Sequence, residues 1–337
     1  MRILYGVSGD GFGHSSRTLV IADFLEKQGH QVKIVTYGRA VNVLKRFDLF
    51  RVSGMALVFS RGVLKKRKTL AHTARVVAKN LFSWNKFHKL MRDFKPDLCI
   101  SDMEPIVPIL SYWYKLPLIC VDNQHRITNL QLDVPKKYYK DYLMAKAVVN
   151  RFVARAEHFI VTSFATAKIK RKNTTIVPPI IRPDVLKLKP KYGSRILVYL
   201  TRKNTGIINI LKRFDEKFVV FGYNINKKDK NLEYRTKNHF LEELGKCRAI
   251  IATAGFTLMS EALYLKKPYL ALPLKGQFEQ VLNSLFLKKA GYGDYSDDLT
   301  YTEVKDFLEN IENYRKKLKS YKLDFNKLPR TLKKVIK

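Results

Sequence analysis

Short apolar runs alternate with longer amphipathic segments along most of this chain. Each run is about as long as a buried strand, and in each longer segment apolar residues recur every three or four positions. The alternation predicts parallel strands joined by helices, and therefore an α/β fold. The predicted strands are 1–7, 31–37, 96–102, 118–123, 158–162, 174–177, 195–200, 218–222, 249–253 and 269–272. The predicted helices are 15–28, 69–92, 103–117, 135–155, 207–214, 239–247, 257–265, 279–290 and a tail from 302 that Pro329 interrupts, while 223–238 and 294–298 have the polarity of loops.

A proline-rich stretch divides this pattern into two halves. The chain has 337 residues, of which 46% are apolar, and that is enough for two domains of about 150 residues each. The stretch contains Pro178, Pro179, Pro183 and Pro190 and no predicted strand. We therefore expect an N-terminal domain over 1–178, a linker over 179–194, a C-terminal domain over 195–320 and a basic tail over 321–337.

The loop after the first strand, SGDGFGHSSR, is rich in glycine. Gly9, Gly11 and Gly13 nearly spell the dinucleotide-binding fingerprint. The match fails because the glycines occupy alternate positions and because the second strand ends in Tyr37-Gly38 rather than in an acidic residue. The loop therefore does not predict NAD binding.

Several polar residues follow the strands of the first half. Asp102, Glu104 and the segment Asp122-Asn123-Gln124-His125 come at strand ends, and the carboxyl ends of parallel strands share one edge of a sheet. We expect them to converge near His14. An imidazole titrates near neutrality, so His14 is a candidate general base, with capping of its helix or phosphate binding as the alternatives. Asp102 is a candidate to orient His14, and capping of the next helix is its alternative.

The segment Ile250 to Gly293 predicts a strand–helix–strand–helix unit with Gly255 at the first turn. A glycine before a helix lets a ligand approach the backbone, and the helix N–H groups and dipole favour a phosphate. Glu261 lies one turn into that helix, where its carboxylate can accept both hydroxyls of a ribose. Polar residues that can bind a sugar open the next helix: Gln277, Glu279, Gln280 and Asn283. The alternative is a structural turn with solvent-exposed polar residues.

The stretch AGFTLMSEALYLKKPYLALPLKGQFEQVLNS resembles the donor-binding segment of GT-B glycosyltransferases. It is most similar to the family 28-like group that contains the undecaprenyl-linked N-acetylglucosaminyltransferase of peptidoglycan synthesis and the diacylglycerol glucosyltransferases. Ala254-Gly255 replaces the usual glycine pair, and Lys266 replaces the glycine before Lys-Pro. SDMEP and DNQH are similar to motifs of an uncharacterised microbial branch of the superfamily.

This resemblance implies two Rossmann-like domains facing a cleft, with a tail that crosses back to the first domain. The C-terminal domain would bind a UDP-linked sugar, a hexose or N-acetylhexosamine, and the N-terminal domain would bind a hydroxyl acceptor. Transfer would invert the anomeric centre without a cofactor, since the nucleotide-sugar is a co-substrate. No Asp-x-Asp motif supports the metal-dependent GT-A mechanism, and no zinc spacing occurs.

The implied catalytic residues are His14 and Asp102. The implied donor-binding residues are Thr201, Asn204, Gly255, Phe256, Thr257, Glu261, Gln277, Glu279, Gln280 and Asn283. The implied acceptor-binding residues are Gly11, Gly13, Glu104, Asn123, Gln124 and His125.

Charge adds a membrane surface to the expected partners. The chain has 64 basic and 29 acidic residues, a formal net charge of +35, which attracts polyanions and anionic lipids. Leu49 to Arg92 has no acidic residue, and its predicted helix places basic residues and Trp84 as a membrane-surface helix does. The alternative is an ordinary helix on the sheet with a solvated basic face. We expect a cytoplasmic protein on the inner face of the membrane, near a lipid-linked acceptor, because there is no leader or spanning segment and its three cysteines suit buried free thiols.

Two other functions fit part of the pattern. A non-hydrolysing sugar-nucleotide 2-epimerase shares the fold, but it needs several acid–base groups around the donor sugar, and the second half offers only Glu279. A nucleic-acid-binding protein would explain the charge, but the recognition modules of that class are absent from the sequence.

Overall fold

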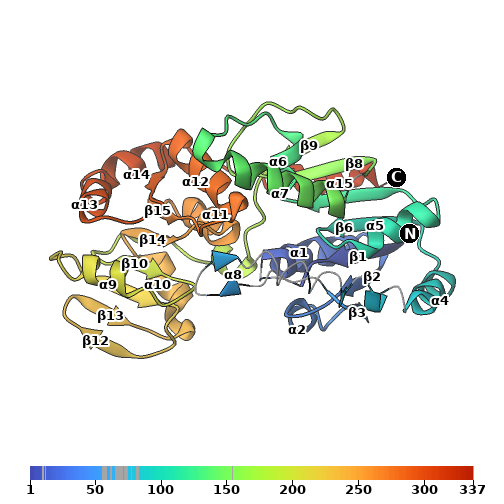
Figure 1. Ribbon diagram of the computed structural model, residues 1–337, viewed down its shortest axis with the longest axis horizontal. Helices are drawn as coiled ribbons and strands as arrows, with labels where there is room; N and C mark the ends of the chain where they lie inside the picture. The colour runs from blue at the N-terminus through green and yellow to red at the C-terminus, as the bar shows by residue number, and fades with distance from the viewer. Residues whose placement is uncertain are drawn as a thin grey trace. The chain divides into compact units, whose positions relative to one another are not determined.

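The computed structural model describes residues 1–9, 11, 13–54, 59–60, 63–64, 71, 75–76, 78–80, 83–153 and 155–336. The chain forms two compact units (Figure 1). Unit 1 is Met1–Ile180 together with Asp324–Lys337, and unit 2 is Ile181–Leu323. The stretch predicted to be a linker contains a short helix, α8 (Pro183–Leu186), and from Ile181 on it belongs to unit 2.

Unit 1 contains a seven-stranded sheet in the order β3-β2-β1-β6-β7-β8-β9, and all of its strand pairs are parallel. Its strands are β1 (Arg2–Val7), β2 (Gln31–Thr36), β3 (Asp48–Arg51), β6 (Leu98–Asp102), β7 (Leu118–Asp122), β8 (His158–Thr162) and β9 (Thr174–Val177). Its helices include α1 (Gly13–Lys27), α2 (Ala40–Val43), α4 (Trp84–Phe94), α5 (Ile106–Trp113), α6 (Arg126–Asn129) and α7 (Tyr139–Phe152). A two-stranded antiparallel sheet, β4 (Phe59–Ser60) with β5 (Val63–Leu64), accompanies them.

The last helix of the chain, α15 (Lys327–Val335), packs in unit 1 although the whole of unit 2 precedes it. Leu328 and Leu332 lie in the same buried apolar cluster as residues of β1 and α1. Pro329 is the third residue of this helix and does not interrupt it, because a proline in the first turn removes no hydrogen bond that the helix needs.

Unit 2 repeats the design with the sheet order β12-β13-β11-β10-β14-β15-β16. Its pairs are parallel except β12–β13. Its strands are β10 (Ile196–Tyr199), β11 (Phe218–Phe221), β12 (Lys227–Asp229), β13 (Leu232–Tyr234), β14 (Ala249–Thr253), β15 (Tyr269–Leu272) and β16 (Gly293–Tyr295). Its longer helices are α9 (Thr205–Leu211), α10 (Phe240–Lys246), α11 (Phe256–Tyr264), α12 (Phe278–Ala290), α13 (Tyr301–Glu309) and α14 (Ile311–Lys319).

The central strands form because both of their faces are covered. Every residue of β6, β7, β14 and β15 is buried, as expected of strands between two helical layers. The predictions were wrong at the edges: β3 and β16 were not predicted, and the expected polar loop 223–238 contains β12 and β13. No helix in the described part of the chain has the length and apolarity needed to cross a membrane.

The predicted helix 69–92 is not continuous in the structure. α4 begins at Trp84 after a turn at Ser83, and a separate helical stretch contains residues 75–76 and 78–80. Leu70, Ala74, Val77 and Leu81 of the predicted apolar face, and the basic run 65–68, lie outside the described residues. Within α4, Phe87, Leu90 and Met91 are buried while Lys86, Lys89 and Arg92 are exposed, so this part is amphipathic as expected.

Candidate active site

The predicted site residues of unit 1 follow three neighbouring strands. β1 pairs with β6 and β6 with β7, so the carboxyl ends of these strands lie side by side at one edge of the sheet. The chain leaves β1 toward β2 on one side and reaches β6 on the other. This reversal of strand order is the place where open α/β sheets bind ligands.

His14 and Asp102 meet at this edge. Nδ1 of His14 lies 2.7 Å from Oδ1 of Asp102. The side chain of His14 is 14% exposed and that of Asp102 is fully buried, so the imidazole remains accessible while the carboxylate does not. In such a pair the carboxylate holds the imidazole in one orientation and stabilises the imidazolium when it forms. The geometry allows the predicted base and orienting residue to act together.

A third residue, Arg17, completes the arrangement. Its Nε donates to Oδ2 of Asp102 at 2.8 Å, its Nη2 donates to Oδ1 at 2.7 Å, and its Nη1 donates to Oδ1 of Asn123 at 3.0 Å. Burial opposes the charge of the guanidinium, but the attraction and hydrogen bonds of Asp102 outweigh that effect and raise the pKa of Arg17. The Asp102 carboxylate therefore has two partners from α1, His14 and Arg17.

Glu104, which we expected to face the acceptor, instead caps α5. Its carboxylate is buried and accepts the backbone N–H groups of Ile106 at 2.9 Å and Val107 at 2.8 Å. Burial raises the pKa of Glu104 to about 7, although the two N–H groups oppose the rise. The alternative that Asp102 caps this helix is therefore wrong, since Glu104 has that role.

The segment after β7, like Glu104, is buried in unit 1. Asn123, Gln124 and His125 are buried, and Asn123 is the oxygen partner of Arg17. Nδ1 of His125 lies 2.6 Å from Oδ2 of Asp122, and its backbone N–H donates to Oδ1. These contacts brace the edge of the sheet, so the acceptor-binding role that we expected of the three residues is not supported by their positions.

Cys120, Asp122 and His125 form a group whose ligand atoms lie within 4.8 Å of one another. Such a group could surround a metal ion, but its members are hydrogen-bonded to one another. Burial, and then the charge of Asp122, raise the pKa of the Cys120 thiol, and its Sγ donates to Oδ2 of Asp122 at 3.1 Å. Although burial opposes its charge, His125 holds the pKa of Asp122 below its ordinary value. We interpret the group as a hydrogen-bonded brace.

Glycines shape the loop between β1 and α1. A Cβ on Gly9 would lie 1.9 Å from the carbonyl oxygen of Tyr37, so only glycine fits beneath the end of β2. Gly11 has a φ of 84°, which glycine adopts at no steric cost. Gly13 is the first residue of α1 and brings His14 into the first turn of the helix.

In unit 2 the predicted donor residues also gather at one edge. β10, β14 and β15 are neighbours in the sheet, and the turns that carry Thr201, Gly255 and Gln277 follow their carboxyl ends. The strand order reverses between β10 and β14, as it does between β1 and β6 in unit 1. Thr201 is exposed. Asn204 caps α9 by accepting the N–H of Ile207 at 3.1 Å.

The turn between β14 and α11 is open. A Cβ on Gly255 would meet no described atom within 4 Å, and its φ of −69° suits any residue. Gly255 is the N-cap of α11 and has no side chain with which to cap the helix. Neither space nor backbone conformation requires a glycine at position 255. We therefore interpret this glycine as leaving room for a ligand to approach the backbone. Thr257 is partly exposed in that first turn, and Phe256 is buried.

Glu261 is fully buried and paired, which the sequence did not predict. Nε and Nη2 of Arg182 donate to its two carboxylate oxygens at 2.5 and 2.7 Å. Arg182 is 36% exposed and comes from the beginning of unit 2. A ribose can reach the carboxylate only if the two share it or if Arg182 moves.

The polar residues around α12 mostly hold the turns in place. Oε1 of Gln280 accepts the N–H of Leu274 at 3.0 Å, and its Nε2 donates to Gln277 at 2.6 Å. Asn283 is fully buried and donates to the carbonyl oxygen of Ala254 at 2.8 Å. Asn283 therefore supports the turn before α11 instead of facing a ligand, while Glu279 is partly exposed in the first turn of α12.

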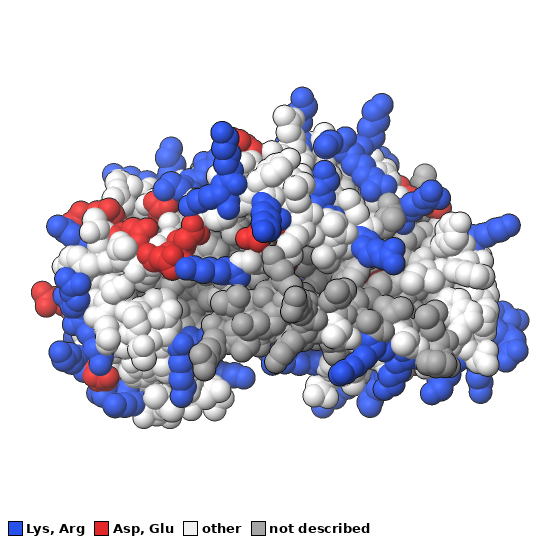
Figure 2. Space-filling view, viewed as in Figure 1, with Lys and Arg blue, Asp and Glu red and all other residues white. Residues whose placement is uncertain are grey.

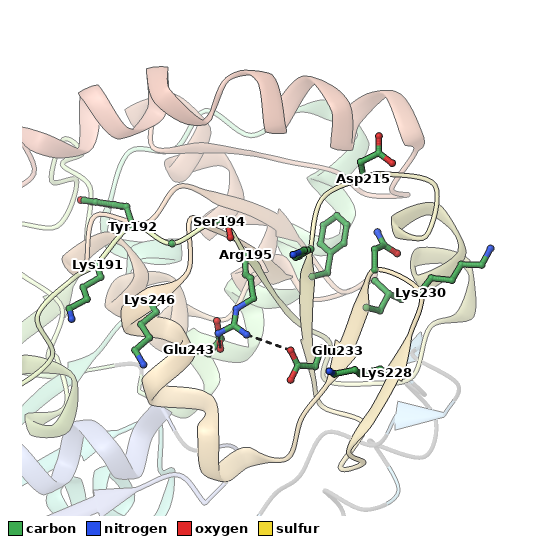
Figure 3. A pocket seen from close by; sticks show the side chains of 15 residues that line it. Lys191, Tyr192, Ser194, Arg195, Asp215, Lys228, Lys230, Glu233, Glu243 and Lys246 are labelled. Atoms are coloured by element: carbon green, nitrogen blue, oxygen red, sulfur yellow. Dashed lines mark hydrogen bonds and ion pairs between the residues drawn. The ribbon is translucent and has the colours of Figure 1, made fainter.

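A cavity of about 970 Å³ opens at the opposite edge of unit 2 (Figure 3). It lies at the amino ends of β10, β11 and β13, and two of its acidic groups are engaged, since Arg195 pairs with Glu233 at 3.5 Å and Glu243 at 2.7 Å. Ligands of such sheets bind at the carboxyl ends of the strands, so we assign this cavity no part in the site.

Sequence reasoning missed the two arginines that engage the site carboxylates. Arg17 had a signal, because it lies three residues after His14 on the same face of α1. Arg182 had none, because only the fold brings the proline-rich stretch against α11.

Comparisons with known proteins agree with this architecture. Residues 1–312 match the model of a family described as glycosyl transferase family 1. An uncharacterised glycosyltransferase of Methanosarcina acetivorans is 24% identical over 378 residues, which cover 100% of this chain and 98% of that protein. The UDP-N-acetylglucosamine--N-acetylmuramyl-(pentapeptide) pyrophosphoryl-undecaprenol N-acetylglucosamine transferase of Clostridium botulinum is 30% identical over 160 residues, 42% of this chain and 44% of that one.

Solved structures show the same fold. A spinosyn forosaminyltransferase superposes over 100% of both chains with a TM-score of 0.67 at 14% identity. A calicheamicin glycosyltransferase superposes over 94% of this chain and 92% of its own with a TM-score of 0.63 at 17% identity. The expected fold of two Rossmann-like α/β units is thereby confirmed. The chain belongs to glycosyl transferase family 1 and is a glycosyltransferase with the GT-B fold.

Proposed function

We propose that this glycosyltransferase moves a hexose or N-acetylhexosamine from a UDP-linked donor to the hydroxyl group of a lipid-linked acceptor, with inversion and without a metal. The observation that carries the reaction is the accessible His14 imidazole on the buried Asp102 carboxylate. The family match favours transfer over the 2-epimerase and the nucleic-acid-binding alternatives.

His14 would be the base. Its Nε2 takes the proton of the acceptor hydroxyl as that oxygen attacks the anomeric carbon of the donor. The bond from this carbon to the diphosphate oxygen breaks, and its electrons leave with the nucleoside diphosphate. One direct displacement inverts the configuration, so a product with retained configuration by NMR would overturn this step.

The donor would bind at the carboxyl edge of unit 2. The open turn at Gly255 would give a diphosphate access to the first turn of α11, where N–H groups and the helix dipole would stabilise its charge. The Clostridium relative is named for a UDP-linked donor, whereas a solved rhamnosyltransferase of this fold was captured with thymidine diphosphate. Activity that persists in EDTA would support departure of the diphosphate without a metal.

A thermal-shift panel of UDP, GDP, dTDP, UDP-glucose, UDP-galactose and UDP-N-acetylglucosamine tests the donor. A ligand at a hundred times its Kd adds about 2.7 kcal/mol to the stability of the folded state. Glu261→Ala should remove the shift but also leaves Arg182 unpaired, so a second variant is needed. A Cβ at Gly255 meets no described atom within 4 Å, so Gly255→Ala has room in the free protein and would obstruct only a ligand. Gly245→Ala in α10 is the matched control, because its Cβ meets only ordinary contacts. Equal shifts in all three variants would place the donor elsewhere.

An aromatic surface on unit 1 supports a lipid-linked acceptor. We define it as Ile109, Tyr112, Trp113 and Tyr114 of the α5 region together with Trp84 of α4. Tyr112 is 71% and Trp113 is 65% exposed, and the Trp84 and Trp113 rings lie 5.8 Å apart. Exposed lysines flank it: Lys86, Lys89 and Lys115. Exposed tryptophan and tyrosine beside lysine are suited to the interface of an anionic membrane.

Basic side chains also cover much of the visible faces of both units, while acidic ones gather mainly over unit 2 (Figure 2). Sedimentation with vesicles that contain an anionic lipid should pull down the protein, and neutral vesicles should do so less. Tyr112→Ser with Trp113→Ser should reduce binding severalfold, and Tyr192→Ser in unit 2 should not. Neutralising residues 65–68 should also weaken binding. Unchanged sedimentation of these variants would refute the membrane proposal.

A further inference from the structure

Arg17 has no part in the proposed chemistry, yet it is buried beside the proposed base. Its guanidinium contacts three elements: His14 on its own helix, Asp102 at the end of β6, and Asn123 after β7. We propose that Arg17 is a positioning residue which fixes the orientation and the tautomer of His14 by sharing the Asp102 carboxylate. This inference deepens the proposed role of His14 and rests on it.

The hydrogen bonds of Asp102 determine how His14 can bind. Arg17 occupies Oδ2 with Nε at 2.8 Å and one direction of Oδ1 with Nη2 at 2.7 Å. His14 takes the remaining direction of Oδ1, also at 2.7 Å. A two-point contact from a planar guanidinium leaves the carboxylate little freedom to rotate. The direction available to the imidazole is therefore set by Arg17.

The same contacts assign the tautomer. A carboxylate paired with a buried guanidinium is ionised and can only accept hydrogen bonds. Nδ1 of His14 must then carry a hydrogen, and the lone pair of the neutral ring lies on Nε2. This is the nitrogen that a base needs free for the acceptor hydroxyl.

Arg17 also changes the electrostatics of the pair. Its Nη2 lies 3.3 Å from Nδ1 of His14. Because both nitrogens carry hydrogens, this contact is a repulsion between two donors that share Oδ1. Nη2 of Arg17 therefore confines the Nδ1–H of His14 to the remaining direction of Oδ1.

The other titratable groups near this cluster do not replace Arg17. Tyr5 of β1 is buried, and burial together with the charge of Asp102 raises its pKa. Cys120 and Asp122 of β7 interact with the cluster at longer range, and Asp122 is paired with His125. Arg17 is the cation in hydrogen-bond contact with Asp102 among the described residues.

A purely structural role is the competing explanation, since Arg17 ties α1 to β6 and to the segment after β7. The two explanations differ in one observable. A brace would change stability when it is lost, whereas a positioning residue would also change the tautomer of His14.

The test is histidine NMR on the full-length free protein with ¹³C,¹⁵N-labelled histidine, assigned with His14→Gln. In the wild type the neutral ring should carry its hydrogen on Nδ1. In Arg17→Met and in Arg17→Lys the two-point contact is lost and the Asp102 carboxylate is free to turn, so both tautomers of the neutral ring should appear.

An unchanged tautomer in a folded Arg17→Met would overturn the proposal and leave Arg17 as a brace. If that variant does not fold, Arg17→Lys decides, and a single wild-type tautomer there overturns the proposal equally. These readouts need no substrate. A wild-type protein that transfers no sugar, or a His14→Gln variant as active as the wild type, would refute the proposed function and leave the NMR result intact.

Discussion

The pKa of the Glu104 carboxyl group depends on two opposing effects, burial and capping of α5. Two N–H groups and the amino end of α5 favour its charged form, while burial favours the neutral form. Burial is the larger effect and raises the pKa from its ordinary 4.5 to about 7. We therefore predict that unit 1 becomes less stable as the pH rises from 5 to 8, and that Glu104→Gln removes this part of the pH dependence.

The sign follows from proton binding. Between pH 4.5 and 7 the folded state holds a proton on Glu104 that the unfolded state has released, so stability is fully present below 4.5 and is lost as the pH rises through 7. Each pH unit that separates the folded and unfolded pKa values contributes about 1.4 kcal/mol, so the loss from pH 5 to 8 is about 2 to 3 kcal/mol. The amide of glutamine keeps the shape of the side chain but does not titrate.

Urea unfolding followed by tryptophan fluorescence measures this effect. The chain has two tryptophans, Trp84 in α4 and Trp113 in α5, so the signal reports unit 1. Glu26→Gln on the exposed part of α1 is the control with the same chemical change. Glu104→Gln loses one capping hydrogen bond at every pH, so only the slope with pH is diagnostic. Parallel curves for Glu104→Gln and the wild type would show that capping outweighs burial, and the reasoning would be wrong.

Three further predictions concern buried contacts. Lys267 is fully buried and its ammonium donates to the carbonyl oxygens of Lys191, Gly245 and Cys247. Lys267→Met should therefore destabilise unit 2 by about 1 to 3 kcal/mol, measured as faster hydrogen exchange of the backbone around these carbonyls. Unchanged exchange would contradict this prediction. Asn283→Ala should weaken nucleotide binding in the thermal-shift assay by about tenfold, because the turn before α11 loses its hydrogen bond from Asn283. An unchanged shift would show that this turn keeps its conformation without Asn283. Leu332→Ala should destabilise unit 1 by about 2 to 5 kcal/mol in the fluorescence assay because it leaves a cavity in the core, whereas Lys333→Ala, at an exposed position of α15, should have little effect.

The sequence predicted the strands that are buried along their length and missed several strands at or next to the edges of the sheets. The strands β8, β14 and β15 begin and end where they were predicted, because nearly all of their residues are buried. The edge strand β9 was also predicted with its observed bounds, although it is only half buried. β12 is lysine-rich and largely exposed, as edge strands often are, so it has no apolar run to detect.

For the candidate site, the sequence predicted which residues come together at a sheet edge but not how their side chains pair. Strand ends and topology were enough to bring His14 and Asp102 to one edge, and Thr201 and Gly255 to another. Side-chain pairing was not, because a guanidinium can reach a carboxylate from any element that the fold places nearby. Glu104 shows a different failure: acidic groups are favoured at the amino end of a helix, and the rule about strand ends obscured this role.

The position of α15 has a consequence for the order in which the protein can fold during synthesis. The ribosome makes all of unit 2 before the leucines that complete the apolar cluster of unit 1. Until residue 332 has left the exit tunnel, the first 180 residues have their sheet but lack part of its cover, and apolar surface of this kind recruits chaperones or other nascent chains. Unit 2 is continuous in sequence and faces no such delay. The domain that is synthesised first is therefore the one that is completed last.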